Sequence, residues 1–265
     1  MDLGAKRALG DLIGGLAFYR VWGMMSLREV RRRYRRTLFG PFWVTITLLI
    51  FSSVLGIIWS SLWKQDISAF LPYLLSGLIP WTFISMICSE SCAAFLSAET
   101  LVRNRAIPYS FFIFGVISRN FIVMAHNLLA VIIIYLFFLK SISLVNFVQL
   151  LLGFLILMAT SWWIGMMLAM ASARYRDVQQ GVSSFLQIVM FITPIFWPKE
   201  MIGADRMILV DINPLMYFIE IIRLPLLGES VPGMHYLVTA LITILGTIFA
   251  LLIMSRKLKD IIHWL

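Results

Sequence analysis

The sequence predicts an all-α membrane protein with six transmembrane helices. Of its 265 residues, 61% are hydrophobic and 13% are charged, which is about half the charged share of an ordinary soluble domain. The hydrophobic residues form continuous runs of about twenty residues, the length that an α-helix needs to cross a bilayer. A transmembrane β-barrel would instead alternate apolar and polar residues over about ten residues. Composition therefore excludes a water-soluble domain, and the continuous runs favour helices over a barrel.

The chain begins with a basic amphipathic segment. Leu9, Leu12 and Leu16 recur at helical spacing. Asp11 lies between them, and Arg20 follows them. This pattern predicts a helix that lies in the membrane interface, and a solvated leader is the alternative. We expect no cleavable signal peptide, because the segment lacks a short apolar core that ends in a small-residue cleavage site.

A block of arginines marks the point where the chain enters the membrane. Five arginines fall within residues 31–36, Gly40 and Pro41 then break the pattern, and Phe42 and Trp43 open an apolar run. A dense positive block followed by aromatic residues is typical of a cytoplasmic membrane anchor. We therefore expect residues 1–40 to be a cytoplasmic interface segment.

Six apolar runs predict the spans, at about 42–62, 71–94, 111–139, 147–171, 182–196 and 236–254. Charged residues and prolines interrupt residues 199–233 too often for a span, which predicts short re-entrant or interfacial helices there. We expect a single transmembrane domain over residues 1–265, with a six-span bundle at 42–254 and a cytoplasmic tail at 255–265.

The distribution of Lys and Arg predicts the orientation of these spans. If the N-terminus is cytoplasmic, sixteen Lys and Arg fall in cytoplasmic segments and five in outer segments. Cytoplasmic loops carry an excess of Lys and Arg, so both termini are predicted to be cytoplasmic. The net charge of +9 reflects this clustering at the ends of apolar runs, and we predict no nucleic-acid partner.

No enzyme motif is present. The chain lacks the glycine-rich Walker sequence, so it does not bind ATP through such a loop, and it lacks a His-Glu-x-x-His zinc motif. Cys88 and Cys92 lie one helical turn apart without partner ligands, which indicates packing rather than a metal site. We predict no catalytic residue, no metal and no directly bound cofactor.

Two residues of the Asp, Glu, Lys and Arg class, Glu90 and Arg119, fall inside predicted spans. Ionisable groups in a membrane are costly and usually paired or functional. Glu90 lies near the inner end of the second span and Arg119 lies about ten residues into the third, so their depths match. We predict an intramembrane ion pair, which either fixes helix packing or takes part in gating.

Aromatic residues form stripes along the first and fifth spans. Phe51, Trp59 and Trp63 share one face of the first span, and Phe185 and Phe196 share one face of the fifth. Such rings stack on sugars and can line a channel for a polymer. The alternative is an interfacial aromatic belt together with lipid or core contacts.

Two short charged connectors separate pairs of spans, at residues 97–108 and 173–180. The first connector contains Arg103 and Arg105. The second contains Arg174, Arg176 and Asp177. These segments are either solvated loops or short helices that dock on a cytoplasmic partner.

Four motifs in order resemble the membrane subunits of type-2 ABC exporters, especially those for O-antigen polysaccharide. They are residues 33–43 (RYRRTLFGPFW), 173–177 (ARYRD), 193–198 (TPIFWP) and 213–215 (NPL). The motifs extend over almost the whole chain. The first departs at Phe39, where a smaller aliphatic residue is common in the family.

The resemblance implies a homodimer in the inner membrane with a channel between two copies, and two copies of a separate nucleotide-binding subunit that supplies ATP hydrolysis. It implies a lipid-linked polysaccharide as cargo. By position, the N-terminal interface helix and the two groups Arg103, Arg105 and Arg174, Arg176, Asp177 would contact the ATPase. The aromatic stripes would line the channel, and the short helices in 199–233 would form an outer gate region.

Other cargoes share this architecture: capsule, teichoic-acid-type polymer, or a small lipid or drug. A hypothesis of another class is a membrane-embedded glycosyl or acyl transferase. Such an enzyme needs acidic residues on loops at one face, and Asp205, Asp211, Glu220 and Glu229 are the one cluster of that kind.

Overall fold

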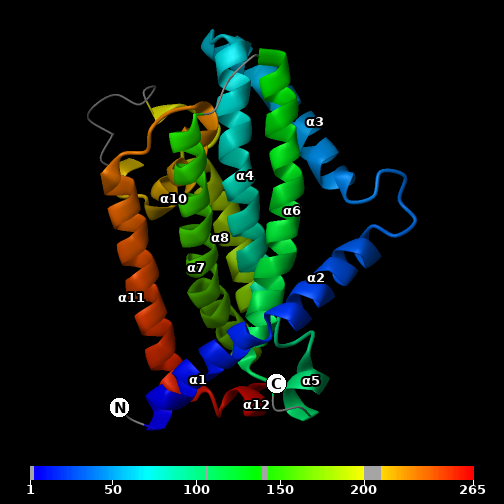
Figure 1. Cartoon of the computed structure of the whole chain (residues 1–265), viewed down its shortest axis with the longest axis vertical. Helices are drawn as coiled ribbons and strands as arrows, with labels where there is room; N and C mark the ends of the chain where they lie inside the picture. Colours follow the sequence, from blue (N-terminus) through cyan, green and yellow to red (C-terminus); the bar gives the residue numbers. More distant parts are fainter. Residues whose placement is uncertain (1–2, 105–106, 139–142, 200–209) are drawn as a thin grey trace.

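The computed structural model describes residues 3–104, 107–138, 143–199 and 210–265, and the regular elements among them are α-helices. They are α1 (Leu3–Ala17), α2 (Tyr19–Arg33), α3 (Phe42–Trp63), α4 (Ile67–Cys92), α5 (Glu99–Asn104), α6 (Tyr109–Phe138), α7 (Leu144–Arg174), α8 (Val178–Ile192), α10 (Pro214–Leu227), α11 (Gly233–Lys257) and α12 (Ile261–Trp264). Figure 1 shows an upright bundle, with α1 and α2 slanting across its lower end.

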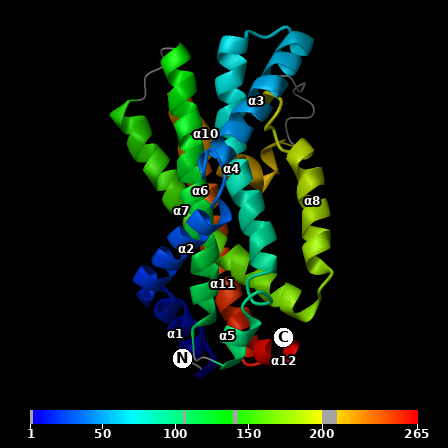
Figure 2. The ribbon, with the colours of Figure 1, turned by 90° about the vertical axis from the view of Figure 1, so that its right-hand side faces the viewer.

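Five of the described helices are long and apolar enough to cross a membrane: α3, α4, α6, α7 and α11. They confirm five of the six predicted spans as apolar helices of sufficient length. The sixth prediction corresponds to α8, which has 15 residues and stands beside the bundle (Figure 2). At 1.5 Å per residue α8 is about 22 Å long, shorter than a hydrocarbon core of about 30 Å. The count of six spans therefore stays a prediction.

Helix α4 is the centre of the bundle. It packs against α3, α6, α7, α8 and α10, and 78% of the residues in its apolar stretch are buried. The approach of α7 is close, because a Cβ atom added at Gly165 would lie 2.8 Å from Oγ of Ser91. In α3 and α11 the buried share is 22% and 17%. Most of the apolar surface of these two helices is thus left for lipid or for another chain.

The N-terminal amphipathic segment forms two helices rather than one. The chain bends at Phe18, so that α1 packs against α6 and α11 whereas α2 packs against α6. The arginine block starts in the last turn of α2 and ends at Arg36, which has a positive φ of 69°. The block thus ends in a turn that leads to α3.

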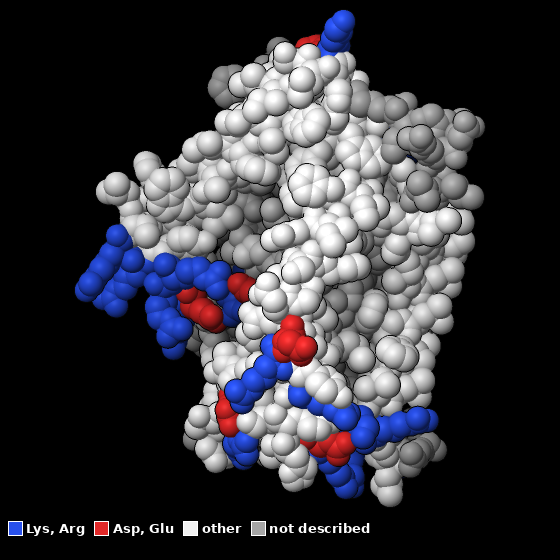
Figure 3. All heavy atoms as spheres, turned by 180° about the vertical axis from the view of Figure 1, so that it is seen from behind, with Lys and Arg blue, Asp and Glu red and all other residues white. Residues whose placement is uncertain are grey.

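Both termini lie at the lower end of the bundle, together with α1, α5 and α12 (Figure 1). We call this the terminal end, and we call the opposite end, where α4 begins, the distal end. Lys, Arg, Asp and Glu gather over the lower part of the face shown in Figure 3, below a broad uncharged area. In the segment predicted to hold short helices, the structure describes α10, and residues 200–209, with Asp205, lie outside the described residues.

Candidate functional site

A cluster of charged side chains joins α2 to α4 and α6 near the terminal end. Arg119 donates from Nε and Nη2 to Oε2 of Glu90, at 2.9 and 2.7 Å, and from Nη1 to Oε2 of Glu29, at 2.7 Å. Arg33 donates to Oε1 of Glu90 at 3.1 Å, and Asn120 Nδ2 donates to Oε2 of Glu90 at 2.9 Å. We call these five residues the α2 cluster.

The structure brings Glu90 and Arg119 together because α4 and α6 are neighbours and the two residues lie at similar depths. Their side chains are 20% and 13% exposed. Charges buried to this degree are stable only when they are paired and hydrogen-bonded. The cluster also includes Glu29 and Arg33 from α2, so moving α2 away would leave Nη1 of Arg119 and Oε1 of Glu90 without the partners that α2 supplies. The α2 cluster therefore fixes α2 to the bundle.

A second buried carboxylate, Asp11 in α1, binds the start of α6. Its Oδ2 accepts the Tyr109 amide at 2.7 Å, and its Oδ1 accepts the amide and hydroxyl of Ser110 at 2.9 and 2.6 Å. Burial raises the pKa of Asp11, and the hydrogen bonds from Ser110 and Tyr109 oppose that rise. A carboxylate at the first amides of a helix satisfies donors that the helix itself leaves unpaired. Asp11 thus fixes α1 to α6.

Sequence reasoning missed Asp11, which it treated as one polar residue of an amphipathic helix. The available signal was a lone acidic residue on the helix face that carries the small residues Ala8 and Gly15, and this face is the buried one. Small residues let a second helix approach closely, and α6 does so at Gly15. A Cβ atom at Gly15 would lie 2.6 Å from Cβ of Ser110. The contact itself spans 98 residues of sequence, so no local pattern shows the partner.

The residues expected to contact an ATPase lie at or near the terminal end. Arg103 in α5 pairs with Glu99 at 2.9 Å, with both side chains about half exposed. Arg174 lies 5.6 Å from the ring of Trp264 and 5.1 Å from that of Tyr175. Of the other residues expected to contact an ATPase, Arg176 and Asp177 are exposed in the turn before α8. Arg105 lies outside the described residues.

The five aromatic residues that were predicted to line a channel differ in how exposed their side chains are. Phe51 is 44% and Phe185 is 62% exposed, so both rings face outward from the chain. Trp59 and Trp63 are half-buried and contact each other, with ring centroids 4.5 Å apart. Phe196 is 6% exposed and packs within the core of the chain itself.

Among the described residues, no three His, Cys, Asp or Glu side chains are grouped so that they could hold a metal ion. Cys88 and Cys92 are free thiols, and Sγ of Cys92 donates to the carbonyl of Cys88 at 3.2 Å. This contact within α4 agrees with a packing role for the two cysteines.

The chain matches the family model "ABC-2 type transporter" over residues 20–227. It is similar to the Escherichia coli polysialic acid transport protein KpsM, with 26% identity over 75% of this chain and 78% of that protein. It is also similar to the O-antigen export system permease protein RfbA of Klebsiella pneumoniae, with 22% identity over 93% of this chain and 94% of that protein. A third relative is RfbA of Myxococcus xanthus, 22% identical over 71% of this chain and 73% of that protein.

The family match covers well over half of the chain and includes α2, the α2 cluster, four of the five long apolar helices and α10. The long apolar helices and these relatives identify a multi-pass integral protein of the bacterial inner membrane. The chain belongs to the ABC-2 type transporter family.

Proposed function

We propose that this chain is the permease subunit of an ATP-driven exporter that moves a lipid-linked polysaccharide, the O antigen, across the inner membrane. One observation carries the proposal: the alignment with the Klebsiella O-antigen export permease extends over 93% of this chain. The chain is a transport subunit and not an enzyme. It binds no cofactor directly, and a separate partner subunit hydrolyses ATP.

The proposed topology has six spans, with α8 as the fifth, and both termini in the cytoplasm. Charged residues gather near the terminal end in Figure 3, and sixteen of the Lys and Arg fall in segments assigned to the cytoplasm against five outside. The positive-inside bias then assigns the terminal end to the cytoplasm. The distal end, with the start of α4, faces the periplasm.

The proposed assembly contains two copies of this chain and two copies of an ATPase. The channel lies between the two copies and is lined by α3 and α8, which present Phe51 and Phe185 on their outward faces. The ATPase contacts the terminal end through α5 and the turn that carries Arg176 and Asp177. The α2 cluster makes α2 and the bundle move as one body when the ATPase changes shape.

Capsule export is the nearest alternative, and it is favoured by the similarity to the Escherichia coli polysialic acid transport protein. A teichoic-acid-type polymer, a small lipid or a drug fits the same architecture. The transferase hypothesis is weaker, because one of its acidic residues, Glu220, is buried and paired with Lys199 and His235. Glu220 is thus already held by partners within the chain, which opposes a role as a free acid or base.

Deletion of the gene tests the proposed function. The expected result is loss of long-chain polysaccharide from the cell surface and accumulation of the lipid-linked polymer inside, with restoration by the gene on a plasmid. The tagged protein should co-purify with an ATPase and with a differently tagged second copy. Normal surface polysaccharide, with accumulation of an unmodified lipid-linked sugar, would favour the transferase instead.

Asp177→Arg tests the docking of the ATPase. The variant should keep the amount of folded protein, because Asp177 is exposed and makes no side-chain cap bond to α8, while ATPase co-purification and export fall. Lys64→Glu is the matched control, a charge reversal at an exposed position of the distal end. Wild-type export by Asp177→Arg contradicts the assignment.

Phe185→Ala tests the lining of the channel. It should assemble normally and export poorly, because the ring is outward-facing and supports no core contact. Phe249→Ala on α11 is the control, since that ring is 52% exposed on a helix outside the proposed lining. Equal surface polysaccharide in the two variants rejects the lining role of Phe185.

A further inference from the structure

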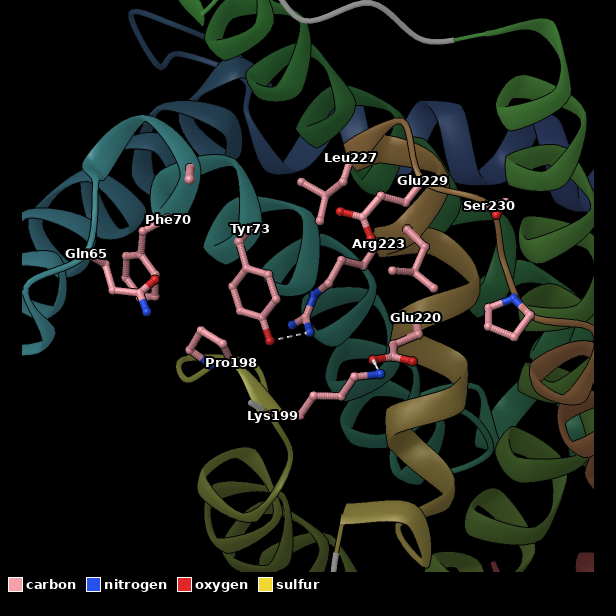
Figure 4. Close-up of a pocket in the computed structure, with 13 residues that line it drawn as sticks. Gln65, Phe70, Tyr73, Pro198, Lys199, Glu220, Arg223, Leu227, Glu229 and Ser230 are labelled. Carbon is pink, nitrogen blue, oxygen red and sulfur yellow. Dashed lines mark hydrogen bonds and ion pairs between the residues drawn. The ribbon is translucent and has the colours of Figure 1, made fainter. Parts of the chain in front are cut away.

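A pocket of about 500 Å³ lies at the distal end, between the start of α4, α10, residues 198–199 and residues 229–232 (Figure 4). This volume falls within the range of about 300–1,000 Å³ that is usual for small-molecule sites. No residue of the pocket belongs to the α2 cluster or to the proposed channel lining. Neither the α2 cluster nor the channel lining therefore explains why this pocket is present.

Arg223 of α10 is the most buried charge that borders the pocket. Its side chain is 1% exposed, Nη1 donates to the hydroxyl of Tyr73 at 2.9 Å, and the guanidinium lies 4.2 Å from the Tyr73 ring centroid. Gly77 provides the space, because a Cβ atom there would lie 2.1 Å from Nη2. Nε and Nη2 of Arg223 have no hydrogen-bond partner among the described residues.

Unused donors on a buried guanidinium are costly, and buried polar groups are almost always satisfied. Figure 4 shows the Arg223 head beside Tyr73, at the wall of the pocket. An acceptor that enters the pocket would let the guanidinium turn toward it and use these donors. The observation points to a ligand with oxygen acceptors.

The charges around the pocket balance one another. Arg223 and Lys199 are opposed by Glu220 and Glu229, and Lys199 Nζ lies 3.3 Å from Oε1 of Glu220. A phosphate group would lie next to two carboxylates, so the site does not favour an anion. Carboxylates accept hydrogen bonds, whereas Lys and Arg donate them. A ligand that both donates and accepts, and carries no charge, matches this lining.

We propose that this pocket binds a neutral sugar unit beside Tyr73. The hydroxyls of the sugar bond to four polar residues that line the pocket: Gln65, Lys199, Arg223 and Glu229. The inference rests on the proposed function, because it places a subsite for the exported polymer at the periplasmic end. Hydroxyls that donate to Glu229 and accept from Lys199 make charge-assisted hydrogen bonds. The site holds successive sugars weakly, which hinders the polymer from slipping back.

Ala69→Trp tests the pocket by filling it. Ala69 lines the pocket one helical turn before Tyr73 and is exposed, so a tryptophan blocks the space without removing a polar contact. Ser61→Trp is the matched control, an exposed residue in the last turn of α3 that does not line the pocket. Glu229→Gln, at an exposed loop position, weakens an acceptor and leaves the pocket open.

The probe is the oligosaccharide repeat released from the host's surface polysaccharide, added to the purified protein in nanodiscs and followed by saturation-transfer NMR. Wild type and Ser61→Trp should bind it saturably, Ala69→Trp at least tenfold more weakly, and Glu229→Gln several-fold more weakly. Sodium phosphate should neither bind nor compete.

Equal binding by Ala69→Trp and wild type, absence of binding by wild type, or binding of phosphate in place of the sugar overturns the proposal. These outcomes leave the proposed function standing if deletion of the gene still removes the surface polysaccharide. If deletion has no such effect, the proposed function fails first, whatever the binding experiment gives.

Discussion

Arg119 and Arg223 are both buried in the bundle, one near each end, and they differ in how their donors are used. All three nitrogens of Arg119 donate to carboxylates of the α2 cluster. Arg223 is more deeply buried, yet one of its nitrogens donates, to a neutral hydroxyl. A closed network of this kind holds helices together, whereas spare donors beside a pocket indicate a place where a ligand completes the bonding. The burial of a charge alone does not distinguish a network that holds helices together from a site that binds a ligand.

The largest effect is expected for Arg119→Ala. It leaves Glu90 and Glu29 without their main partner, and removing one member of a buried ion pair costs about 3–5 kcal/mol. The measurement is the free energy of unfolding of the purified protein in mixed micelles. A loss below about 1 kcal/mol would show that the α2 cluster does not hold the helices together.

Gly77→Ala should destabilise the protein by about 1–3 kcal/mol, because its Cβ atom overlaps Arg223 and overpacking of a core has that cost. Gly181→Ala in α8 is the matched control. Nothing lies within 4 Å of a Cβ atom at Gly181, so there the change should stabilise the helix by up to about 1 kcal/mol. The same sign of effect at both positions contradicts the close packing of Arg223 on α4.

Glu220→Gln should change how stability depends on pH. Burial raises the pKa of Glu220, but the hydrogen bond to His235 and the charges of Lys199, His235 and Arg223 outweigh it, so its pKa lies below the ordinary 4.5.

The ionised Glu220 therefore contributes stability above about pH 4.5 that is lost as the pH falls through the lowered pKa. The melting temperature of wild type, measured from pH 7 to pH 3, should fall more steeply in this window than that of Glu220→Gln. At pH 7 the variant should be less stable by about 1–3 kcal/mol. Parallel curves would mean that Glu220 is not held ionised by its neighbours.

The smallest effect is expected for Arg103→Ala, which removes the pair with Glu99 in α5. Both side chains are about half exposed, and an exposed pair four residues apart contributes about 0.3–0.5 kcal/mol. The same unfolding measurement checks it. If the loss of unfolding free energy were as large as that of Arg119→Ala, exposed and buried ion pairs would stabilise this protein equally.

The sequence predicted the helices well because apolar runs and their polar ends are local signals. The structure starts α3 at Phe42 as expected, and α11 extends the predicted 236–254 by three residues at each end. The break at Phe18 was not predicted, because the helical spacing continues through it. The bounds of α8 also differed: the helix has the length of the predicted run, 15 residues, but starts four residues earlier, at Val178, and ends at Ile192, before Pro194 and the turn around it.

Contacts at the candidate sites were predictable only where two residues on neighbouring spans were expected at the same depth in the membrane. Glu90 and Arg119 were paired in this way. The participation of Glu29 and Arg33 depends on the slant of α2 across the bundle, which no periodicity encodes. Likewise, the contact of Glu220 with His235 joins α10 to α11, and the space for Arg223 comes from Gly77 on α4. These partners are set by three-dimensional packing and not by spacing in the sequence.

The anchoring of α1 by Asp11 has a consequence for biogenesis. The partners of Asp11, Tyr109 and Ser110, lie 98 and 99 residues further along the chain, so at about 5–20 residues per second the ribosome needs about 5–20 s to make them. Helix α11, the other helix on which α1 packs, emerges later still. During translation α1 is therefore without the partners of Asp11 until the start of α6 has been made, and its packing is complete only when α11 has been inserted. Helix α1 is made before α6 and α11, yet it is among the last of the described helices to be fully packed.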